Sequence, residues 1–322
     1  ACLMPYFNAC VRVAGGSNTG RTRVVILPDG SKKQIVFHLV PTGWADNKLS
    51  VIGDWVLIEL SRLITEIDCI VEAIGAPNAP LYISKRAPLH LPYHGLLERW
   101  IDGVKVSDRA IGSTGRGISP MLAGVDLRLA PLAGHLLYPD LFKKYVEEFY
   151  RSFKPIFKEM AAFGKVRLAE IAPNLVVEKL LAEAEKIKPY LADTDPVLHD
   201  LADRNVPTLF GMTQGYGLHF RCSYPFISAT HSTAAAAAYC SGLPMSAFGP
   251  VIMATKLFPT RVGEGPFPTG LWSRAEALQF PKEHPELFSE LPEFKPPRRQ
   301  AFLQSARLHI NGGNYDSAML AK

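Results

Sequence analysis

Four glycine-containing loops carry the residues best suited to binding a phosphorylated ligand. They are GGSNTGRT at 15–22, IGSTGRGISP at 111–120, GMTQGYG at 211–217 and TRVGEGPFPTG at 260–270. Glycine lets backbone N–H groups approach an anion closely, and hydroxyl and arginine side chains complete its coordination. A single loop of this kind is more often a simple turn. Because all four follow predicted strands, where α/β proteins bind ligands, we expect them to converge on one cleft that binds a phosphorylated ligand.

Other chemistries have weaker support. The nine histidines show no HExxH or Cys/His metal spacing, and His90 and His94 are separated by Pro92, which disfavours a helical metal pair. His231 precedes a predicted helix and is either an anion contact or, more simply, a residue of the capping region. The sequence has neither a GxSxG nucleophile elbow nor a complete GxxxxGK[ST] phosphate loop.

The composition is that of a globular protein. The 322 residues are 48% hydrophobic and 20% charged, enough for a large core. The net charge of +5 favours small anionic ligands and is too low to predict a nucleic-acid partner. No run of 18 apolar residues predicts a membrane span. Five cysteines without a CxxC pair predict reduced thiols in a cytoplasmic protein.

The elements that would position these loops alternate between strands and helices. Their order predicts an α/β fold with a central, largely parallel sheet, surrounding helices and a helical excursion around 138–200. The strand segments are 8–16, a hairpin over 22–40 with its turn at Asp29-Gly30, the start of 49–67, a short strand near 80–84, and 206–211 and 250–258.

Helices are predicted from apolar periodicity. The second part of 49–67 has its apolar positions at 57, 60, 63, 64 and 67. Segment 138–160 has a cap at Asp140, a kink at Pro155 and an apolar stripe, and it precedes a second amphipathic helix over 174–191. Segment 232–242 is capped by Ser232 or Thr233 and ends near Gly242. The stripe consists of Leu141, Phe142, Tyr145, Phe149, Phe153 and Ile156.

Taken in order, these loops resemble the motifs of the adenylosuccinate synthetase family. The resemblance spans residues 11 to about 270 and continues weakly to 322. The matching segments are GGSNTGRT for the family's G-G-x-N-A-G-H-T, FHLVPTG (37–43) for L-H-L-(I/V)-P-(S/T)-G, IGSTGRGISP for I-G-T-T-G-R-G-I-G-P, MTQG (212–215) for G-A-Q-G, YPFISA (224–229) for Y-P-(Y/F)-V-T-S, and TRVGEGPFPT for T-R-V-G-x-G-P-F-P-T.

The resemblance implies a P-loop-NTPase-like fold and a ligase reaction. The family transfers the γ-phosphate of GTP to O6 of IMP, and the amine of L-aspartate then displaces the phosphate to give adenylosuccinate. Phosphorylation turns a poor leaving group into a good one, and Mg²⁺ between phosphates neutralises charge. The resemblance also implies a cytoplasmic homodimer, and a single domain over 1–322 without the family's first strand, phosphate loop and C-terminal part.

Motif by motif, the resemblance assigns roles to individual residues. Asn18 would contact the substrate's phosphate region, and Gly20 would offer its carbonyl to Mg²⁺ near the triphosphate. Gln214 would hold the purine near its reacting carbonyl. The other implied contacts are Thr114 and Ser228 for the 5′-phosphate, Val262 and Gly263 for the ribose, Arg298 and Arg299 for aspartate, and Lys322 for the base of the triphosphate. A solvated pair is an equal alternative for the two arginines.

The chain also departs from the family pattern. The family's catalytic histidine falls at Arg21, which could stabilise a transferring phosphate but cannot donate a proton near neutral pH. The glutamate expected before the Gln214 loop is missing. Arg128 is the nearest candidate for the arginine that completes the partner's site. The family's G-D-E-G-K-G-K loop, with its catalytic base, would precede residue 1.

These departures leave two alternatives to the IMP reaction. The first is the phage branch of the family, which makes 2-aminoadenylosuccinate from dGMP and aspartate with ATP or dATP. The second is a nucleotide-binding homologue that has lost catalysis. The identity of the nucleotide pair that supports turnover distinguishes all three.

Overall fold

The computed structural model of the 322-residue chain describes residues 3–27, 29–104, 115–223, 227, 229 and 231–253. Contacts divide the chain into two compact units. The first comprises 1–100, 115–214 and 231–249, and the second comprises 101–114, 215–230 and 250–322. The single domain expected over 1–322 stays a prediction. The first unit contains the sheet, most of the helices, loop 15–22 and the segments 115–120 and 211–214 of two further loops.

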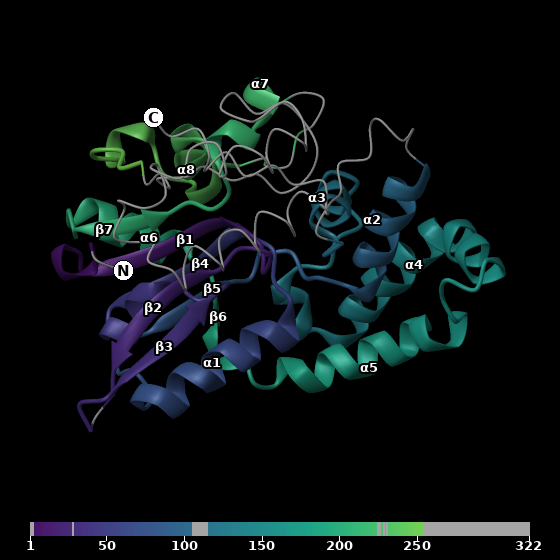
Figure 1. The fold of residues 1–322 in the computed structure, drawn as a ribbon, viewed down its shortest axis with the longest axis horizontal. Coiled ribbons are helices and arrows are strands. Elements are labelled where there is room, and N and C mark those ends of the chain that lie inside the picture. Colours follow the sequence, from purple (N-terminus) through teal and green to yellow (C-terminus); the bar gives the residue numbers. More distant parts are fainter. Residues whose placement is uncertain are drawn as a thin grey trace, which may run out of the picture. The chain divides into compact units, whose positions relative to one another are not determined.

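A five-stranded parallel sheet forms the centre of the first unit (Figure 1). Its strand order is β6-β5-β4-β1-β7, and every neighbouring pair is parallel. Residue Val11 of β1 aligns with Val51 of β4 and Phe210 of β7. This confirms the predicted α/β class. The strands are β1 Ala9–Gly15, β4 Leu49–Val56, β5 Leu81–Ser84, β6 Leu191–Ala192 and β7 Thr208–Gly211.

The two faces of the sheet bury different helices, because successive side chains of a strand point to opposite sides. Ile52 belongs to the large apolar cluster formed with α1, α4 and α5. Its neighbour Val51 belongs to a smaller cluster with α6 and α8. The helices of the two units are α1 Leu60–Ile74, α2 Pro92–Val104, α3 Ile118–Asp126, α4 Pro139–Ala162, α5 Pro173–Ala184, α6 Asp195–Asp203, α7 Phe220–Ser223 and α8 Ala234–Ser241.

Helix α1 forms as its sequence predicts. The five apolar positions of the expected stripe are all buried, and the helix ends before Gly75, whose φ is +77°. The preceding segment is strand β4, so the predicted change from strand to helix within 49–67 is confirmed. The helix places its first turns beside the carboxyl ends of β1 and β4.

The predicted hairpin is a separate two-stranded antiparallel sheet, β2 Arg21–Ile26 with β3 Lys32–Phe37. Its turn uses local chemistry, because Asp29 Oδ1 accepts the N–H of Ser31 at 2.8 Å and Gly30 has φ +81°. Val25, Ile35 and Phe37 are buried in the large cluster. The hairpin therefore attaches to the main body by one face.

The helical excursion around 138–200 is confirmed, with corrections of detail. Helix α4 begins at Pro139, so Asp140 lies in its first turn and is not its cap. Pro155 lies inside a helix that continues to Ala162. Phe142 and Phe149 of the predicted stripe are buried, and Phe153 and Ile156 pack partly buried against the large cluster, whereas Leu141 is 40% exposed. The buried face also includes Val146, Phe157 and Met160. The helix predicted over 174–191 ends at Ala184 and is followed by a 3₁₀ turn.

The remaining predictions have mixed outcomes. Helix α8 starts after Thr233 and ends at Gly242, as predicted, although the Thr233 side chain makes no capping hydrogen bond. Helix α2 was not predicted. The strand expected over 250–258 is absent from its described residues 250–253. Short 3₁₀ helices occupy Met4–Tyr6, Thr42–Asp46, Ala133–Leu137, Leu168–Ile171, Lys188–Tyr190, Tyr216–Leu218 and Met245–Ala247. Among the described helices, none is long and apolar enough to cross a membrane.

Candidate functional site

The loop after β1 and the loop after β7 lie against each other. Thr213 Oγ1 donates a hydrogen bond to the carbonyl of Ala14 at 2.9 Å. A Cβ built on Gly15 would lie 1.8 Å from that hydroxyl oxygen, and Gly15 has φ +89°. Only glycine satisfies both the backbone angle and the close approach. The glycine therefore serves loop-to-loop packing at the carboxyl edge of the sheet.

The loop before α3 reaches the same place. A Cβ built on Gly16 would lie 2.6 Å from Ile118 Cδ1, in the first turn of α3. Glu59 accepts the hydroxyl of Ser17 at 2.5 Å and lies 3.9 Å from Arg116 Nη1. The described parts of loops 15–22, 111–120 and 211–217 within the first unit are thus together, as expected. Loop 260–270 lies outside the described residues.

Helix α2 supports the loop before α3. Gly117 N donates to Glu98 Oε2 at 2.5 Å, and a Cβ on Gly117 would lie 2.5 Å from the His94 backbone. Gly117 also has φ +72° as the residue preceding α3. His94 itself is fully buried, with Nδ1 accepting the N–H of Leu91 and its ring edge-on to Phe149. These contacts make His94 part of the core that carries helix α2.

Arg12 is the most deeply buried charged side chain at this edge, at 1% exposure on the central strand β1. Its Nη2 donates to the Gly16 carbonyl at 2.8 Å and to Thr19 Oγ1 at 3.2 Å. Nε and Nη1 have no hydrogen-bond partner among the described residues. Burial, followed by the nearby charge of Arg21, lowers the pKa of Arg12 to about 9. Sequence reasoning missed this residue, although a charge within the apolar run ACVRVAG was a usable signal.

Arg21 begins strand β2 and reaches across to the β7 loop. Its Nη2 donates to the Met212 carbonyl at 3.3 Å. A Cβ built on Gly211 would be 3.9 Å from the same nitrogen. Gly211 directly precedes the MTQG segment, where the family's glutamate is expected. The position of the missing glutamate and that of the substituted histidine, Arg21, are therefore neighbours in space. Burial lowers the pKa of Arg21. The charge of Arg21 lies close enough to Arg12 to contribute to the lowered pKa of Arg12.

His38 holds the loop from the hairpin side. Its Nδ1 lies 2.9 Å from the Thr19 carbonyl, and its Nε2 lies 3.2 Å from Arg62 Nη2. A carbonyl only accepts and a guanidinium only donates, so the ring is neutral with its proton on Nδ1. Partial burial, and then the charge of Arg62, lowers the pKa of His38. A Cβ on Gly20 would lie 3.3 Å from this ring.

Glu66 on α1 fixes the backbone that carries His38. Its carboxylate accepts the N–H groups of His38, Leu39 and Val40 at 2.9, 2.8 and 3.0 Å. The side chain is 5% exposed. Burial raises the pKa of Glu66, while the three N–H donors oppose the rise. This acidic residue within an apolar helix face was also missed, and its position between buried neighbours was the available signal.

The described predicted site residues lie on these loops. Asn18 Oδ1 is buried without a hydrogen-bond partner among the described residues, and Gly20 is exposed. Gln214 ends the described β7 loop of the first unit with φ +71°. Arg128, with φ +61°, is exposed after α3. The described residues contain no group of three His, Cys, Asp or Glu that could hold a metal. Thr114, Ser228, Val262, Gly263, Arg298, Arg299 and Lys322 lie outside the described residues.

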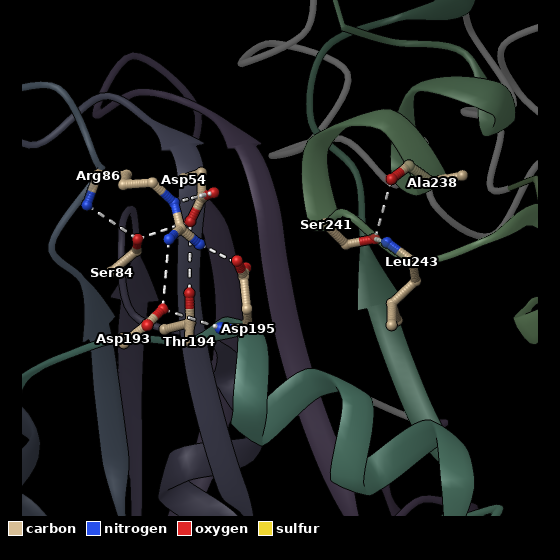
Figure 2. A network of polar contacts seen from close by, with 9 residues as sticks. All are labelled: Asp54, Ser84, Arg86, Asp193, Thr194, Asp195, Ala238, Ser241 and Leu243. Atoms are coloured by element: carbon tan, nitrogen blue, oxygen red, sulfur yellow. Dashed lines mark hydrogen bonds and ion pairs between the residues drawn. The ribbon is translucent and has the colours of Figure 1, made fainter.

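A second charged cluster, the Arg86 network, ties together the ends of β4, β5 and β6 (Figure 2). Arg86 pairs with Asp54 at 2.8 Å, with Asp193 at 3.3 Å and also with Asp195. Asp54 accepts the hydroxyl of Ser84 at 2.6 Å. The hydrogen bond and charge of Asp54 raise the pKa of Arg86. Because the guanidinium is neutralised by protein carboxylates, the network has a structural role.

An aromatic cluster lies beside the end of β4. His231 packs on Trp55 with ring centroids 4.9 Å apart, and its plane is nearly parallel to that of Tyr239 at 6.1 Å. Tyr239 belongs to α8, so the contact joins the strand end to that helix. These ring contacts favour the simpler prediction for His231, a residue that packs ahead of the helix.

Comparison with known proteins places the chain among the adenylosuccinate synthetases. The family model described as adenylosuccinate synthetase matches residues 1–286. The chain is 33% identical over 264 residues to the adenylosuccinate synthetase of Nitratidesulfovibrio vulgaris, covering 81% of the chain and 60% of the relative. It is 34% identical over 285 residues to that of Azotobacter vinelandii, covering 86% and 62%. The chain thus spans about three fifths of the length of these relatives.

Two solved structures share the fold. The fully ligated adenylosuccinate synthetase of Plasmodium falciparum superposes with a TM-score of 0.68 at 22% identity, covering 88% of this chain and 63% of that one. The succinoaminodeoxyadenylate synthetase of cyanophage S-2L, bound to dGMP and dATP, superposes with a TM-score of 0.50 at 18% identity, covering 80% and 59%. At these identities, the likeness establishes the architecture alone.

Proposed function

The chain belongs to the adenylosuccinate synthetase family, and we propose that the protein is a ligase of purine biosynthesis. It would join L-aspartate to C6 of a purine nucleoside monophosphate through a 6-phosphoryl intermediate, with IMP as substrate and GTP as donor. The observation that carries the proposal is the convergence of three loops at the carboxyl edge of the sheet. Gly15 lies against the side chain of Thr213 and Gly16 against that of Ile118, with no room for a side chain at either glycine.

The charges at this edge suit a transferring phosphoryl group. Arg12 on β1 and Arg21 near the end of loop 15–22 are two cations at this edge, and neither forms an ion pair with a carboxylate of the described residues. Phosphoryl transfer depends mainly on positioning and on neutralising the charge of the phosphate oxygens. Arg21 would supply that charge. It does not act as a general acid, because a guanidinium retains its proton at neutral pH.

The residues present fit the implied Mg²⁺. Asn18 Oδ1 is a buried amide oxygen without a partner among the described residues, and the Gly20 carbonyl is its near neighbour in the chain. Oxygen ligands of this kind suit a hard divalent cation. When bound, Mg²⁺ would neutralise phosphate charge between donor and acceptor. Asn18 would also orient the substrate nucleotide, which requires the loop to hold a fixed conformation.

The substrate contacts follow the family motifs. Gln214 would hydrogen-bond the edge of the purine, next to the reacting carbonyl. Thr114 and Ser228 are proposed for the 5′-phosphate, Val262 and Gly263 for the ribose, Arg298 and Arg299 for aspartate, and Lys322 for the base of the triphosphate. A homodimer is proposed as the assembly, with the exposed Arg128 reaching the partner's site. Light scattering of wild type and Arg128→Ala would test the dimer.

One observation favours a second nucleotide pair. Arg21 stands where the family has its catalytic histidine, and this departure is what favours the phage branch of the family. The alternative is therefore a 2-aminoadenylosuccinate synthetase that uses dGMP with ATP or dATP. Neither nucleotide pair requires a different role for the described loops.

A substrate matrix tests both reactions. Wild-type protein is incubated with Mg²⁺, aspartate, each of IMP and dGMP, and each of GTP, ATP and dATP. Succinylated product is measured by mass spectrometry, with Arg21→Ala as the control. Product from one pair identifies the reaction. Nucleotide binding without product from any pair would contradict catalysis and leave the non-catalytic homologue.

A further inference from the structure

Thr19 is held at both of its polar groups by residues from different parts of the first unit. Its hydroxyl oxygen accepts a hydrogen bond from Arg12 Nη2 at 3.2 Å and lies 3.4 Å from the Gly16 carbonyl, to which it donates. Its backbone carbonyl accepts the Nδ1–H of His38 at 2.9 Å. Thr19 thus has both its hydroxyl and its backbone carbonyl held by residues from outside the loop.

The two residues that hydrogen-bond to Thr19, Arg12 and His38, are themselves held in place. Arg12 is buried on the central strand β1, so its guanidinium has little room to move. His38 follows β3 of the hairpin and has its ring fixed by Arg62 and its backbone by Glu66. Thr19 therefore links the loop to both the main sheet and the hairpin.

The link matters most for the second half of the loop, because the first half has contacts of its own, from the Gly16 carbonyl to Arg12 and from the Ser17 hydroxyl to Glu59. Gly15, Gly16 and Gly20 lack side chains, and glycine has the largest conformational freedom to lose. Asn18 and Gly20 flank Thr19 directly, and Arg21 follows two residues later. Fixing both groups of Thr19 therefore fixes the peptide units that present Asn18 and Gly20.

The Thr19 hydroxyl also supplies one of the two acceptors of Arg12 Nη2. The charge of Arg21 acts on Arg12 unfavourably, since it contributes to the lowered pKa of Arg12. Arg12 is directed to Gly16 and Thr19, whereas Arg21 is directed to Met212. Without the hydroxyl, Arg12 Nη2 would retain one acceptor, the Gly16 carbonyl.

We propose that Thr19 is a positioning residue: its hydroxyl, held by Arg12, fixes the conformation of loop 15–20 that presents Asn18 and Arg21 to a phosphoryl ligand. The conformational part of this inference is independent of the reaction. Its kinetic part rests on the proposed function.

The test compares Thr19→Val with Thr19→Ser. Valine preserves the branched shape and removes the hydroxyl, and serine keeps the hydroxyl. Thr65→Val is a matched control, because the Thr65 hydroxyl also donates to a backbone carbonyl, that of Ser61 at 2.9 Å, but from an exposed face of α1. Arg12 is left unchanged, since its substitution risks the fold.

Hydrogen exchange provides a readout that does not need turnover. In Thr19→Val, amides of the peptide covering 14–23 should exchange about tenfold faster, the loss expected for a hydrogen bond to a charged group. Thr19→Ser and Thr65→Val should exchange at the wild-type rate in that peptide. Equal exchange in Thr19→Val and wild type would overturn the proposal.

Kinetics then separates this inference from the proposed function. With an active nucleotide pair, Thr19→Val should lower kcat about tenfold with little change in the KM for the nucleoside monophosphate, and Thr19→Ser should restore it. An unchanged kcat in Thr19→Val overturns the positioning role even where exchange increases. Absence of turnover in the wild type contradicts the proposed function, and the exchange result still decides the conformational part.

Discussion

Two arginines near the carboxyl ends of the strands have opposite surroundings. Arg86 is 43% exposed and paired with Asp54, Asp193 and Asp195 (Figure 2). Arg12 is 1% exposed and has no ion pair with any described residue. An exposed charge gains little from its partners, whereas a buried charge without a counter-ion is costly. The difference separates a cation that carboxylates neutralise at the strand ends from a buried cation that has no ion pair among the described residues.

The largest effect on turnover is expected from removal of Arg21, which, like Arg12, forms no ion pair with a carboxylate of the described residues. Arg21→Ala is expected to lower kcat about 10³-fold, the range seen when an arginine that stabilises a transferring phosphoryl group is lost. Turnover is measured with the active nucleotide pair. Arg86→Ala serves as the matched arginine control and should retain wild-type turnover. Full activity in Arg21→Ala would remove the catalytic role assigned to that position.

The second prediction concerns the contribution of Arg86 to the stability of the fold. Arg86→Met leaves three carboxylates close together, so the free energy of unfolding should fall by about 1–2 kcal/mol, a value kept small by solvent screening. Urea unfolding monitored by circular dichroism measures the change. In an Asp54→Asn background the loss should be smaller, because one of the repelling charges is gone. An equal loss in both backgrounds would show that charge is not the cause.

The salt dependence of stability should also distinguish the exposed Arg86 from the buried Arg12. Between 0.05 and 0.5 M NaCl the destabilisation caused by Arg86→Met should shrink by about half, because mobile ions screen exposed charges. The corresponding difference for Thr19→Val should stay constant, since its partner Arg12 is buried. Unfolding of both variants at the two salt concentrations provides the comparison. A salt-sensitive Thr19→Val would indicate that solvent reaches Arg12.

The smallest effect is the pH dependence of His38. The pKa of His38 is lowered in the fold, so the unfolded chain binds the proton more readily. The stabilisation is therefore complete above the ordinary pKa of about 6.5 and is lost as the pH falls through the lower folded value. His38→Asn should show a weaker loss of stability between pH 7 and 5 than wild type. Parallel pH profiles would assign the effect to other histidines.

The sequence predicted features whose causes are local. The hairpin follows from Asp29-Gly30 between apolar segments, and α1 from five apolar residues at helical spacing. The apolar stripe of α4 was predicted correctly at Phe142 and Phe149 but wrongly included Leu141, because periodicity alone does not fix the edge of the buried face of a long helix. Helix α2 was missed because His90, Pro92 and Tyr93 were assigned to a loop.

The candidate site was predicted only in part, because some of its features are local in sequence and others depend on distant partners. The loops themselves were visible as glycine-rich segments after strands, including Asn18 and Arg21. Arg12 and Glu66 were not selected, because each functions through partners that a linear pattern does not pair. Glu66 accepts backbone N–H groups 26 to 28 residues earlier in the chain. An acidic residue among the apolar positions of α1 could have been noticed, but the sequence does not pair it with those N–H groups.

By itself, the sequence determined the order of the motifs, the alternation of strands and helices and hence the family resemblance. These depend on residue types at short spacings. Only the tertiary structure decided that Thr19 lies between Arg12 and His38, and that Arg21 faces the loop at Gly211 and Met212. Such pairings depend on how a parallel sheet brings distant strand ends to one edge, where burial fixes which polar groups must find each other.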